Sequence, residues 1–593
     1  MMKRTILVTC LRRPVSAPTL LLTLLTVFLV GACDRDPGPP PPPSGGAPGV
    51  LAEGDEAPIR ALYLCGNRFV VINAHPYPVR VGWRVQGTDE AGELTLRAGA
   101  AGDPEFSEVQ LEVRQGGALA LYRGDQLLGV RDNERTACAP VTGGPSLATA
   151  ATGTVGAWSA PAAWPIVPLH VHVLRNGRVL AWGKFGDPYV YNPANGSFAG
   201  APVSAQLFCA GHTFLPDGRL LVAGGHISDG HGLPDTHIFN WKDRTWQTMA
   251  PMLRGRWYPT TTALPNGQVV VIAGRDENGT VVPVPEVWTG SSWRALTGAS
   301  RNFAYYPRTF VAPDGRVFYA GEEKISRWLS TAGSGSWTTG PSHLSGVRDY
   351  GAAVMYLPGK ILYVGGGRTL ATAETIDLND ASPTWRSTGS MAYPRRHLNA
   401  TVLPTGEVLV TGGTRGTSFN ETTLAVHVAE IWNPATGVWR QVAGNAIDRA
   451  YHSTSVLLPD GRVLHAGSGD ALQEDGTPAP DQRNSELYSP PYLFNGARPV
   501  ISSAPSAVGY GQTFTVGTAN AAGVGKVSLI ALGSTTHAFD ANQRFMWLDF
   551  ATTSGGLAVR APAGRTLAPP GWYMLFILDG NDVPSKAKVV RLR

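Results

Sequence analysis

The sequence predicts an all-β protein with a seven-bladed β-propeller at its centre and a β-sandwich on either side. The main observation is a motif that recurs seven times: an apolar segment, a turn of the Pro-Asp-Gly type and a second apolar segment. Because only 16% of the residues are charged and 71 are glycine, many short strands and tight turns are expected. The glycines of the seven turns, spaced 41 to 55 residues apart, are Gly177, Gly218, Gly267, Gly315, Gly359, Gly406 and Gly461. A hairpin repeated at that period is typical of propeller blades.

Residues 1–33 have the layout of a bacterial lipoprotein signal. A basic start is followed by the mostly apolar segment 20–30, which is short for a membrane span of about 20 residues. Val30-Gly31-Ala32-Cys33 then resembles a lipobox, so Cys33 is predicted to be the lipidated N-terminus. Residues 34–53, rich in proline and glycine, are expected to form a stiff linker. The predicted location is the bacterial cell envelope, and the alternative is ordinary secretion.

The net charge gives no indication of a nucleic-acid partner. The formal charge of the whole chain is +5, but Lys3, Arg4, Arg12 and Arg13 all precede Cys33. A chain beginning at Cys33 carries 45 basic and 44 acidic residues, a net charge of +1. We therefore expect no nucleic-acid binding, contact with a membrane only through the lipid anchor, and a monomer.

Residues 54–145 are predicted to form a small β-sandwich. Short stretches that alternate apolar and polar residues, such as 79–85, indicate strands in this region. In an oxidising compartment Cys65 and Cys138 can pair, because both belong to this region. A linker is expected at 146–162, and Cys209 is left over as a cysteine without an obvious structural role.

The propeller is expected over residues 163–490, with blades that resemble the kelch type. A tryptophan follows later in most repeats, where a large ring can fill the space between neighbouring blades. These tryptophans are Trp246, Trp293, Trp337, Trp385 and Trp439. The repeat stops near Pro490, and the strand-like segments of residues 491–593 predict an immunoglobulin-like β-sandwich.

Tyr451 and His452, at the start of the last repeat, place two strong metal-binding side chains side by side. A phenolate oxygen and an imidazole nitrogen suit a tetragonal copper(II) site. In isolation such a pair more often packs in a core than binds a metal. The other repeats supply the context.

Matching motifs occur before the turns of several repeats. They are Phe208-Cys209, Arg256-Trp257-Tyr258, Ala450-Tyr451-His452-Ser453 and, in the last domain, Thr536-His537. With a seven-bladed propeller and a terminal sandwich, this pattern resembles the copper radical oxidases, which include galactose oxidase and glyoxal oxidase. The resemblance covers about residues 160–593.

The resemblance implies a single copper ion held by two tyrosines and two histidines, which here are Tyr258, Tyr451, His452 and His537. It also implies a thioether between Cys209 and the ring of Tyr258. Oxidation of an alcohol or hydrated aldehyde removes two electrons, more than one Cu(II)/Cu(I) couple accepts, so a second carrier is needed. The resemblance assigns that role to the Tyr258 ring as a radical, and the general-base role to Tyr451. The implied reaction oxidises a primary alcohol, an aldehyde or a carbohydrate with O2, releasing H2O2.

Departures from the family pattern concern the substrate. A tryptophan that stacks over the thioether in galactose oxidase is missing at 274–276, so the radical is expected to be shielded differently or less. Arg301 or Arg308 and Thr414 stand where galactose oxidase holds its sugar, and Phe419 matches a ring that lines the pocket. Galactose is therefore disfavoured. The segment 256–259 is nearer to glyoxal oxidase, which favours small aldehydes or simple alcohols.

Other histidines and other functions are alternatives to this interpretation. His170 and His172 share one face of a predicted strand, and they, His212 and His226 are each expected to be packing more often than site residues. A propeller without copper that binds glycan or protein at the cell surface is the alternative function, because a fold does not imply an activity. A hydrolase is disfavoured, since no carboxylate pair or Ser-His-Asp arrangement is visible.

Overall fold

The computed structural model describes residues 59–65, 68–73, 79–96, 107–112, 118–131, 152–417, 419–469 and 478–593. The expected signal, the proline-rich linker and Cys138 lie outside these residues, so lipidation of Cys33 and the Cys65–Cys138 pair stay predictions. Within the described part of the chain, no helix is both long and apolar enough to cross a membrane.

The region before residue 132 forms two β-sheets, as expected for a small sandwich. Their strand orders are β1-β2-β5 and β4-β3-β6-β7. In β3, Val79, Val81 and Val85 are buried, which is the alternation expected of a half-buried strand. The strands are β1 (Ile59–Cys65), β2 (Arg68–Asn73), β3 (Val79–Val85), β4 (Ala91–Leu96), β5 (Ser107–Glu112), β6 (Leu119–Arg123) and β7 (Gln126–Arg131).

Seven sheets of four core strands follow, one for each predicted repeat. Blade one has β10 (His170–Val173), β11 (Val179–Trp182), β12 (Tyr189–Asn192) and β13 (Ser197–Gly200). Blade two has β14 (Gly211–Phe214), β15 (Leu220–Ala223), β18 (Thr236–Asn240) and β19 (Thr245–Thr248), with the side hairpin β16 (His226–Ser228) and β17 (His231–Gly232). Blade three has β20 (Thr260–Ala263), β21 (Val269–Ile272), β22 (Glu286–Trp288) and β23 (Trp293–Ala295).

The remaining blades repeat the same order. Blade four has β24 (Arg308–Val311), β25 (Val317–Gly321), β26 (Ile325–Ser330) and β27 (Ser336–Ser342). Blade five has β28 (Ala352–Leu357), β29 (Lys360–Val364), β30 (Ala373–Asp377) and β31 (Arg386–Thr388). Blade six has β32 (Asn399–Val402), β33 (Val408–Thr411), β34 (Val428–Trp432) and β35 (Trp439–Gly444). Blade seven has β36 (Thr454–Leu457), β37 (Val463–Ala466), β38 (Asn484–Ser489) and β8 (Ala157–Trp158).

The first two strands of each blade form the predicted hairpin. The seven turn glycines all have positive φ, between 75° and 88°. A side chain on the α-carbon disfavours this conformation, which explains why glycine recurs at the turn. The predicted repeat is thus confirmed as a structural unit.

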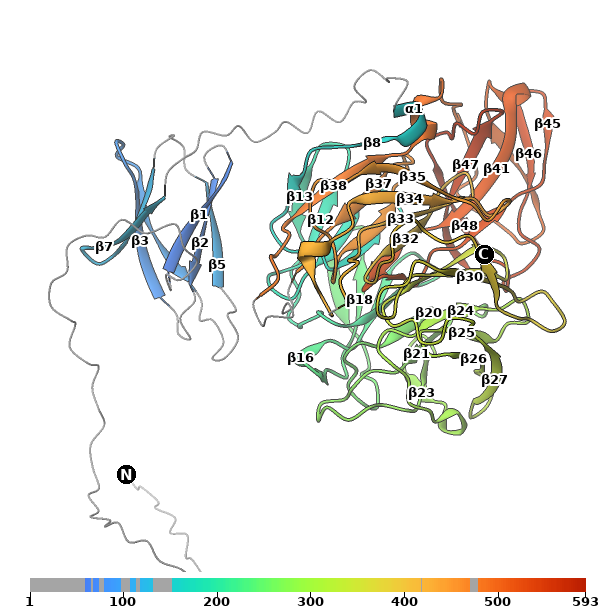
Figure 1. Ribbon diagram of the computed structural model, residues 1–593, viewed down its shortest axis with the longest axis horizontal. Coiled ribbons are helices and arrows are strands. Elements are labelled where there is room, and N and C mark those ends of the chain that lie inside the picture. The colour runs from blue at the N-terminus through green and yellow to red at the C-terminus, as the bar shows by residue number, and fades with distance from the viewer. Residues whose placement is uncertain are drawn as a thin grey trace, which may run out of the picture. The chain divides into compact units, whose positions relative to one another are not determined.

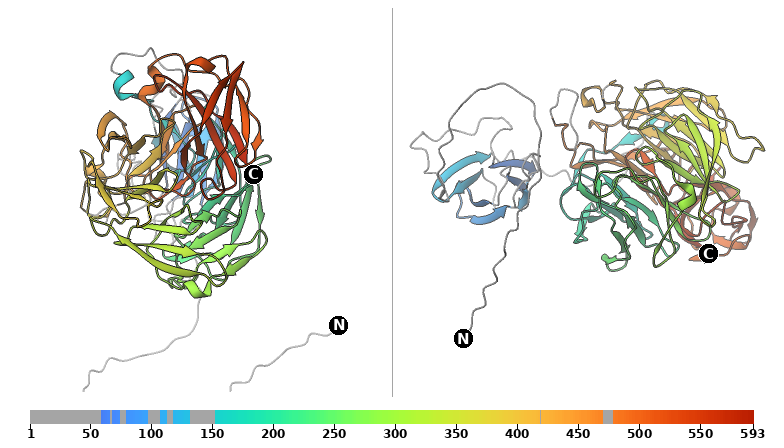
Figure 2. Two further views of the ribbon diagram at one scale, coloured as in Figure 1. Left: turned by 90° about the vertical axis from the view of Figure 1, so that its right-hand side faces the viewer. Right: turned by 90° about the horizontal axis from the view of Figure 1, so that it is seen from below.

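The blades form a ring around their first strands. The first strands of successive blades contact one another, as in β14 with β20, β32 with β36, and β36 with β10. Figures 1 and 2 show the sheets following one another in chain order from green through yellow to orange. The ring closes because β8, from the N-terminal end, pairs with β38 as the outer strand of blade seven. Residues 152–158 of the expected linker therefore contain α1 (Thr152–Val155) and this closing strand.

The predicted tryptophans join neighbouring blades. Each indole N–H donates a hydrogen bond either to the preceding blade or to the segment that connects that blade to the next. Trp246 donates to the carbonyl of Ala201 (2.9 Å), and Trp293 donates to Oγ1 of Thr236 (2.9 Å). Trp337, Trp385 and Trp439 make corresponding bonds. These rings therefore supply both apolar contact and a fixed direction at each blade boundary.

A buried Arg–Glu pair, which the sequence analysis missed, recurs in four blades. The guanidinium bridges a carboxylate on the third strand and a carbonyl oxygen at the end of the second, as Arg395 does with Glu430 (2.6 Å) and Gly412 (3.0 Å). Because both charges are buried, each needs these partners to offset its lost hydration. The four pairs are Arg256–Glu286, Arg348–Glu374, Arg395–Glu430 and Arg449–Glu486.

The C-terminal domain is a β-sandwich of two sheets. One sheet has β39 (Ala507–Val508), β48 (Lys588–Leu592), β47 (Gly571–Asp579), β41 (Val524–Ala531) and β44 (Phe545–Trp547), and the other has β40 (Thr513–Gly517), β46 (Gly556–Arg560) and β45 (Phe550–Thr553). Short strand and helical pieces elsewhere are β9 (Ala162–Ala163), η1 (Thr297–Ala299), η2 (Thr422–Leu424), η3 (Pro491–Phe494) and η4 (Ala521–Gly523).

Strand β47 attaches the sandwich to the propeller. Leu575 and Ile577 lie in the core of the sandwich, whereas Met574 and Phe576 belong to the core that includes the propeller strands. Successive side chains of a strand point to opposite faces, so this almost unbroken apolar strand is buried on both. The C-terminal domain is therefore held firmly enough to position a residue inside the propeller.

That residue is carried by a hairpin, β42 (Ser534–Thr536) and β43 (Phe539–Asp540). β42 pairs antiparallel with β10, the first strand of blade one, with Thr536 opposite His170. The hairpin also contacts the first strands of blades two, five, six and seven. It therefore occupies the centre of the ring, and its turn brings His537 there.

Candidate metal centre

Six loops present their central residue in the same strained conformation. Two residues before the first strand of each of blades two to seven, a residue other than glycine has φ between 45° and 67°. This left-handed region is unfavourable for such residues and tends to be retained at functional sites. The six residues are Cys209, Tyr258, Tyr306, Tyr350, His397 and His452.

Backbone hydrogen bonds connect several of these loops. The N–H of Tyr258 donates to the carbonyl of Cys209 (2.9 Å), and the N–H of Tyr306 donates to the carbonyl of Tyr258 (3.0 Å). The N–H of His397 donates in the same way to Tyr350 (2.9 Å). These bonds link left-handed residues of neighbouring blades and so fix the positions of their α-carbons.

The structure brings together the four residues that the sequence analysis proposed as ligands. The hydroxyl groups of Tyr258 and Tyr451 share a hydrogen bond of 2.6 Å, and the Tyr258 hydroxyl lies 3.2 Å from Nε2 of His452. The ring centroid of His537 lies 4.5 Å from that of Tyr258 and 4.5 Å from that of His452. All four side chains are buried.

The hydrogen bonds of the two histidines leave Nε2 as the unprotonated nitrogen. Nδ1 of His452 must donate to the carbonyl of Gly469 (2.8 Å), which can only accept. The hydroxyl of Thr536 donates to the carbonyl of Leu169 (2.9 Å), so it accepts from Nδ1 of His537 (2.6 Å). Such outer partners are what orients a metal-binding imidazole. Each ring therefore presents a lone pair on Nε2.

Nε2 of His537 is buried and has no hydrogen-bond partner among the described residues. A buried nitrogen without a partner is costly unless something else occupies its lone pair. Two Nε2 lone pairs and two phenol oxygens form a mixed N,O donor set that suits copper(II). Elsewhere the described residues hold no cluster of three or more His, Cys, Asp or Glu side chains suited to a metal. The residues present therefore fit a copper ion.

Burial determines the charge state of the cluster. It raises the pKa of Tyr258 and of Tyr451 well above 10, with neighbouring phenols and Cys209 adding to the rise. Burial also lowers the pKa of His452 to about 3 and that of His537 well below its usual value. Neutral imidazole is the form that binds a metal, and a bound cation would in turn favour the phenolates.

Cys209 is fully buried and shares a small core cluster with Tyr258, Phe208 and Tyr306. Because no tryptophan occurs at 274–276, the Tyr258 ring was expected to be shielded differently or less. The first alternative holds: Trp257 stacks on Tyr258 with ring centroids 3.8 Å apart and planes inclined by 12°. The shield comes from the adjacent residue in sequence instead of from the neighbouring loop.

Two residues considered for substrate binding have structural roles. The guanidinium of Arg308 is buried and donates to the carbonyls of Tyr306 (2.6 Å), Gly351 (3.0 Å) and His537 (3.2 Å). The hydroxyl of Thr414 is likewise buried and donates to the carbonyl of Glu421 (2.6 Å). Neither group is available to hold a sugar, which leaves Arg301 of the two arginines considered for that role.

Phe419 lies where a pocket-lining ring was expected. It is 42% exposed, and its ring centroid lies 4.8 Å from that of Tyr451. Tyr350 and His397, which the sequence analysis missed, lie 5.5 Å and 5.0 Å from the same ring. Their position two residues before a blade's first strand was the signal that could have identified them. Tyr451 is thus the ligand candidate that packs against an exposed aromatic side chain.

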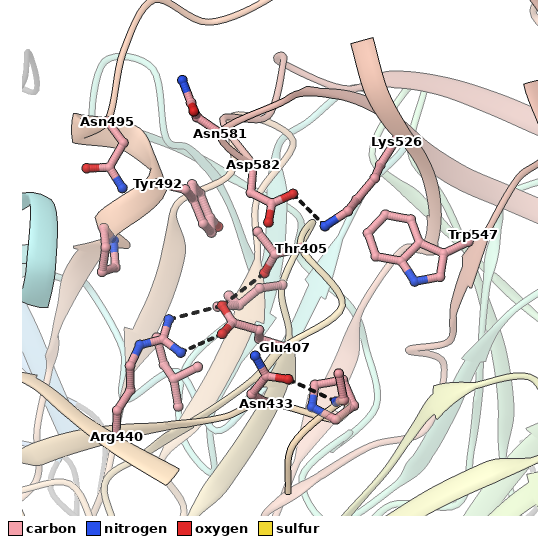
Figure 3. Close-up of a pocket in the computed structure, with 15 residues that line it drawn as sticks. Thr405, Glu407, Asn433, Arg440, Tyr492, Asn495, Lys526, Trp547, Asn581 and Asp582 are labelled. Atoms are coloured by element: carbon pink, nitrogen blue, oxygen red, sulfur yellow. Dashed lines mark hydrogen bonds and ion pairs between the residues drawn. The ribbon is translucent and has the colours of Figure 1, made fainter. Parts of the chain in front are cut away.

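A separate cavity of about 430 Å³ lies between blade six and the C-terminal sandwich and contains none of these residues (Figure 3). Its charged side chains are already paired, Arg440 with Glu407 and Lys526 with Asp582. We therefore place the chemistry at the buried cluster on the propeller axis.

Comparisons with known proteins find oxidases among the relatives of this chain. Residues 368–492 match the family described as glyoxal oxidase N-terminus, and residues 498–592 match the galactose oxidase-like early set domain. A galactose oxidase from Gibberella zeae is 29% identical over 501 residues, covering 75% of this chain and 72% of the relative. The aldehyde oxidase GLOX of Vitis pseudoreticulata is 28% identical over 443 residues, covering 66% and 82%.

The solved structure of a fungal alcohol oxidase of the AA5 family, in complex with copper, superposes with a TM-score of 0.67 at 26% identity. It covers 74% of this chain and 100% of its own. The propeller and the C-terminal domain are therefore similar to those of the galactose oxidase and glyoxal oxidase group.

Proposed function

We propose that this chain is a copper radical oxidase that converts a primary alcohol or aldehyde and O2 into the aldehyde or acid and H2O2. The proposed ligands are Tyr258, Tyr451, His452 and His537. The observation that carries the proposal is the convergence of two unprotonated Nε2 atoms and two phenol oxygens in a buried site. Similarity to oxidases described as acting on galactose, aldehydes and alcohols supports the same class.

Copper, when bound, would accept one of the two electrons removed from the substrate. We propose that the Tyr258 ring, joined to Cys209 by a thioether, accepts the other. The shared core cluster of the two residues supports this link, as does the bond from the N–H of Tyr258 to the carbonyl of Cys209. Trp257 covers one face of the ring and keeps water from it.

Tyr451 is the proposed general base. Because Nε2 of His452 carries no proton, the Tyr258 hydroxyl donates to it, and the Tyr451 hydroxyl donates to Tyr258. Tyr451 also lies against Phe419, which is partly exposed to solvent, and we propose that substrate approaches along this side chain. It can therefore take a hydroxyl proton from substrate once its own phenol is ionised.

The aromatic side chains around Tyr451 favour small or aromatic substrates over sugars. Phe419, Tyr350 and His397 surround Tyr451, and the guanidinium of Arg396 is paired with Asp349 (2.5 Å). Arg308 and Thr414 are engaged with backbone carbonyls. The rings that surround Tyr451 offer mainly aromatic surface, so we propose primary alcohols or aldehydes with an apolar or aromatic side.

The proposal is tested by mass mapping of the purified protein before and after incubation with copper(II) in air. We expect peptides with Cys209 and Tyr258 to join with loss of two hydrogens, and peroxide to appear with a panel of alcohols and aldehydes. Tyr258→Phe is the matched control and should do neither. A protein that binds copper but keeps an intact Cys209 thiol would contradict the proposal and favour the non-catalytic propeller.

A further inference from the structure

Four buried side chains that the copper site does not use form one hydrogen-bonded chain beside it. They are His170 and His172 of β10, His212 of β14 and Ser534 of the C-terminal hairpin. Trp182 packs flat against both His170 and His172, with ring centroids at 5.1 Å and 4.4 Å. Three imidazoles gathered without a carboxylate partner are unusual for a core, since apolar residues would pack there at lower cost.

The hydrogen bonds from Cys209 to Ser534 run in one direction. The backbone N–H of Cys209 can only donate, so Nε2 of His170 accepts from it (3.2 Å). Burial lowers the pKa values of these histidines, that of His212 to about 3, so each ring carries one proton. The Nδ1–H of His170 therefore donates to Nε2 of His212 (3.1 Å), and the Nδ1–H of His212 donates to Oγ of Ser534 (2.8 Å). Oγ of Ser534 also shares a hydrogen bond with Nδ1 of His172 (2.8 Å).

The hydrogen bond from the N–H of Cys209 to His170 takes the place of a backbone hydrogen bond that other loops make. The left-handed Tyr258 and Tyr306 each donate their N–H to the carbonyl of the left-handed residue in the preceding blade. The corresponding residue of blade one is Pro168, which does not have positive φ. Cys209 therefore lacks that acceptor, and the ring of His170 supplies one.

We infer that His170, oriented by His212 and Ser534, is a positioning residue that holds Cys209 in its left-handed conformation for cross-linking to Tyr258. The inference rests on the proposed thioether. Without the imidazole acceptor, the N–H of Cys209 would be buried and unsatisfied, so the loop would relax and move the sulfur away. The C-terminal hairpin then has two roles, since Ser534 orients His212 and through it His170, while His537 enters the copper site.

The test measures the rate of cross-linking after copper(II) addition in His170→Ala, His170→Gln and Ser534→Ala. We expect His170→Ala to bind copper with wild-type stoichiometry but to cross-link about tenfold to a hundredfold more slowly, because misplaced reacting groups lose that much rate. His170→Gln keeps an acceptor near the position of Nε2 and should recover most of the rate. Ser534→Ala should slow cross-linking to a smaller extent.

The control is His465→Ala, which removes another fully buried histidine. Nδ1 of His465 donates to the carbonyl of Thr454 (2.9 Å), and the residue is not part of the hydrogen-bonded series from Cys209 to His172. It should cross-link at the wild-type rate. A folded His170→Ala that cross-links at that rate overturns the inference, and if this variant does not fold, the same result in Ser534→Ala overturns it. A wild-type protein that never cross-links removes the proposed thioether itself, and with it the inference.

Discussion

Trp257 covers the ring of Tyr258 at a centroid distance of 3.8 Å, and its indole N–H donates to Nδ1 of His226 (3.3 Å). The stack places an apolar surface over the residue proposed to hold the radical. It also shows that adjacent residues can serve one site when a left-handed conformation redirects the chain, as it does at Tyr258.

Trp257→Leu should shorten the life of the oxidised Tyr258 state. A stacked aromatic pair contributes about 0.5–1.5 kcal/mol, which corresponds to at most roughly tenfold in rate. The decay of the radical absorption after oxidation measures the effect. Trp257→Phe keeps a stacked ring and should behave close to wild type, whereas equal lifetimes in all three proteins would exclude shielding by this residue.

Tyr451→Phe keeps the ring but removes the proposed proton acceptor. We expect kcat to fall by about 10² to 10⁴, the usual contribution of a positioned general base, while the Cys209–Tyr258 thioether still forms. Steady-state peroxide release and peptide mass mapping measure the two effects. Tyr350→Phe, which alters a neighbouring phenol, should lose much less activity. Full turnover by Tyr451→Phe would remove it from the mechanism.

His537→Ala should weaken copper binding by more than about 10- to 100-fold, because even the loss of an outer partner of a metal ligand costs that much. Titration of the apoprotein with copper measures this affinity. His465→Ala, which removes a buried histidine away from the cluster, should leave it unchanged. Unaltered affinity in His537→Ala would show that the C-terminal domain supplies no ligand.

The buried pair Arg348–Glu374 should make stability depend on pH in acid. Burial alone would raise the pKa of Glu374, but hydrogen bonds from His343 (3.1 Å) and Arg348 (2.7 Å) hold it well below its ordinary value of 4.5. The stabilisation is therefore fully present above pH 4.5 and is lost as the pH falls towards the folded-state pKa.

Glu374→Gln should lower the free energy of unfolding by about 3–5 kcal/mol at neutral pH, since it leaves Arg348 buried without its counter-charge. The difference from wild type should shrink below pH 4.5, as the carboxylate of the unfolded wild type becomes protonated. Urea unfolding at a series of pH values measures it. A difference that stays constant in acid would show that ionisation of Glu374 is not involved.

Cys33→Ser should release the exported protein from membranes if Cys33 carries a lipid. Fractionation of cells into membrane and soluble parts, with mass measurement of the N-terminal peptide, tests this. The full-length oxidase should keep its specific activity, because the proposed site lies within residues 209–537. Membrane association that survives the change would favour an anchor of another kind.

The sequence was sufficient for the features that repeat or are local. The seven turn glycines all adopt positive φ, and the tryptophans after them bridge neighbouring blades, because both effects depend on residue type at a fixed place in a repeat. The ligand candidates Tyr258, Tyr451 and His452 followed from the resemblance to the copper radical oxidases, and each stands just before the first strand of a blade. The buried Arg–Glu pairs could have been found by aligning the repeats.

The tertiary structure alone decided how these parts meet. The stacking of Trp257 and the structural use of Arg308 depend on loop conformations that the residue pattern does not specify. The pairing of β42 with β10 joins segments more than 360 residues apart and delivers both His537 and Ser534. By itself the sequence indicated candidate copper-binding side chains and determined where each blade turns. Long-range packing decides which nitrogen of each histidine carries the proton and what holds Cys209. The hydrogen-bond partners of these groups come together only in the folded ring.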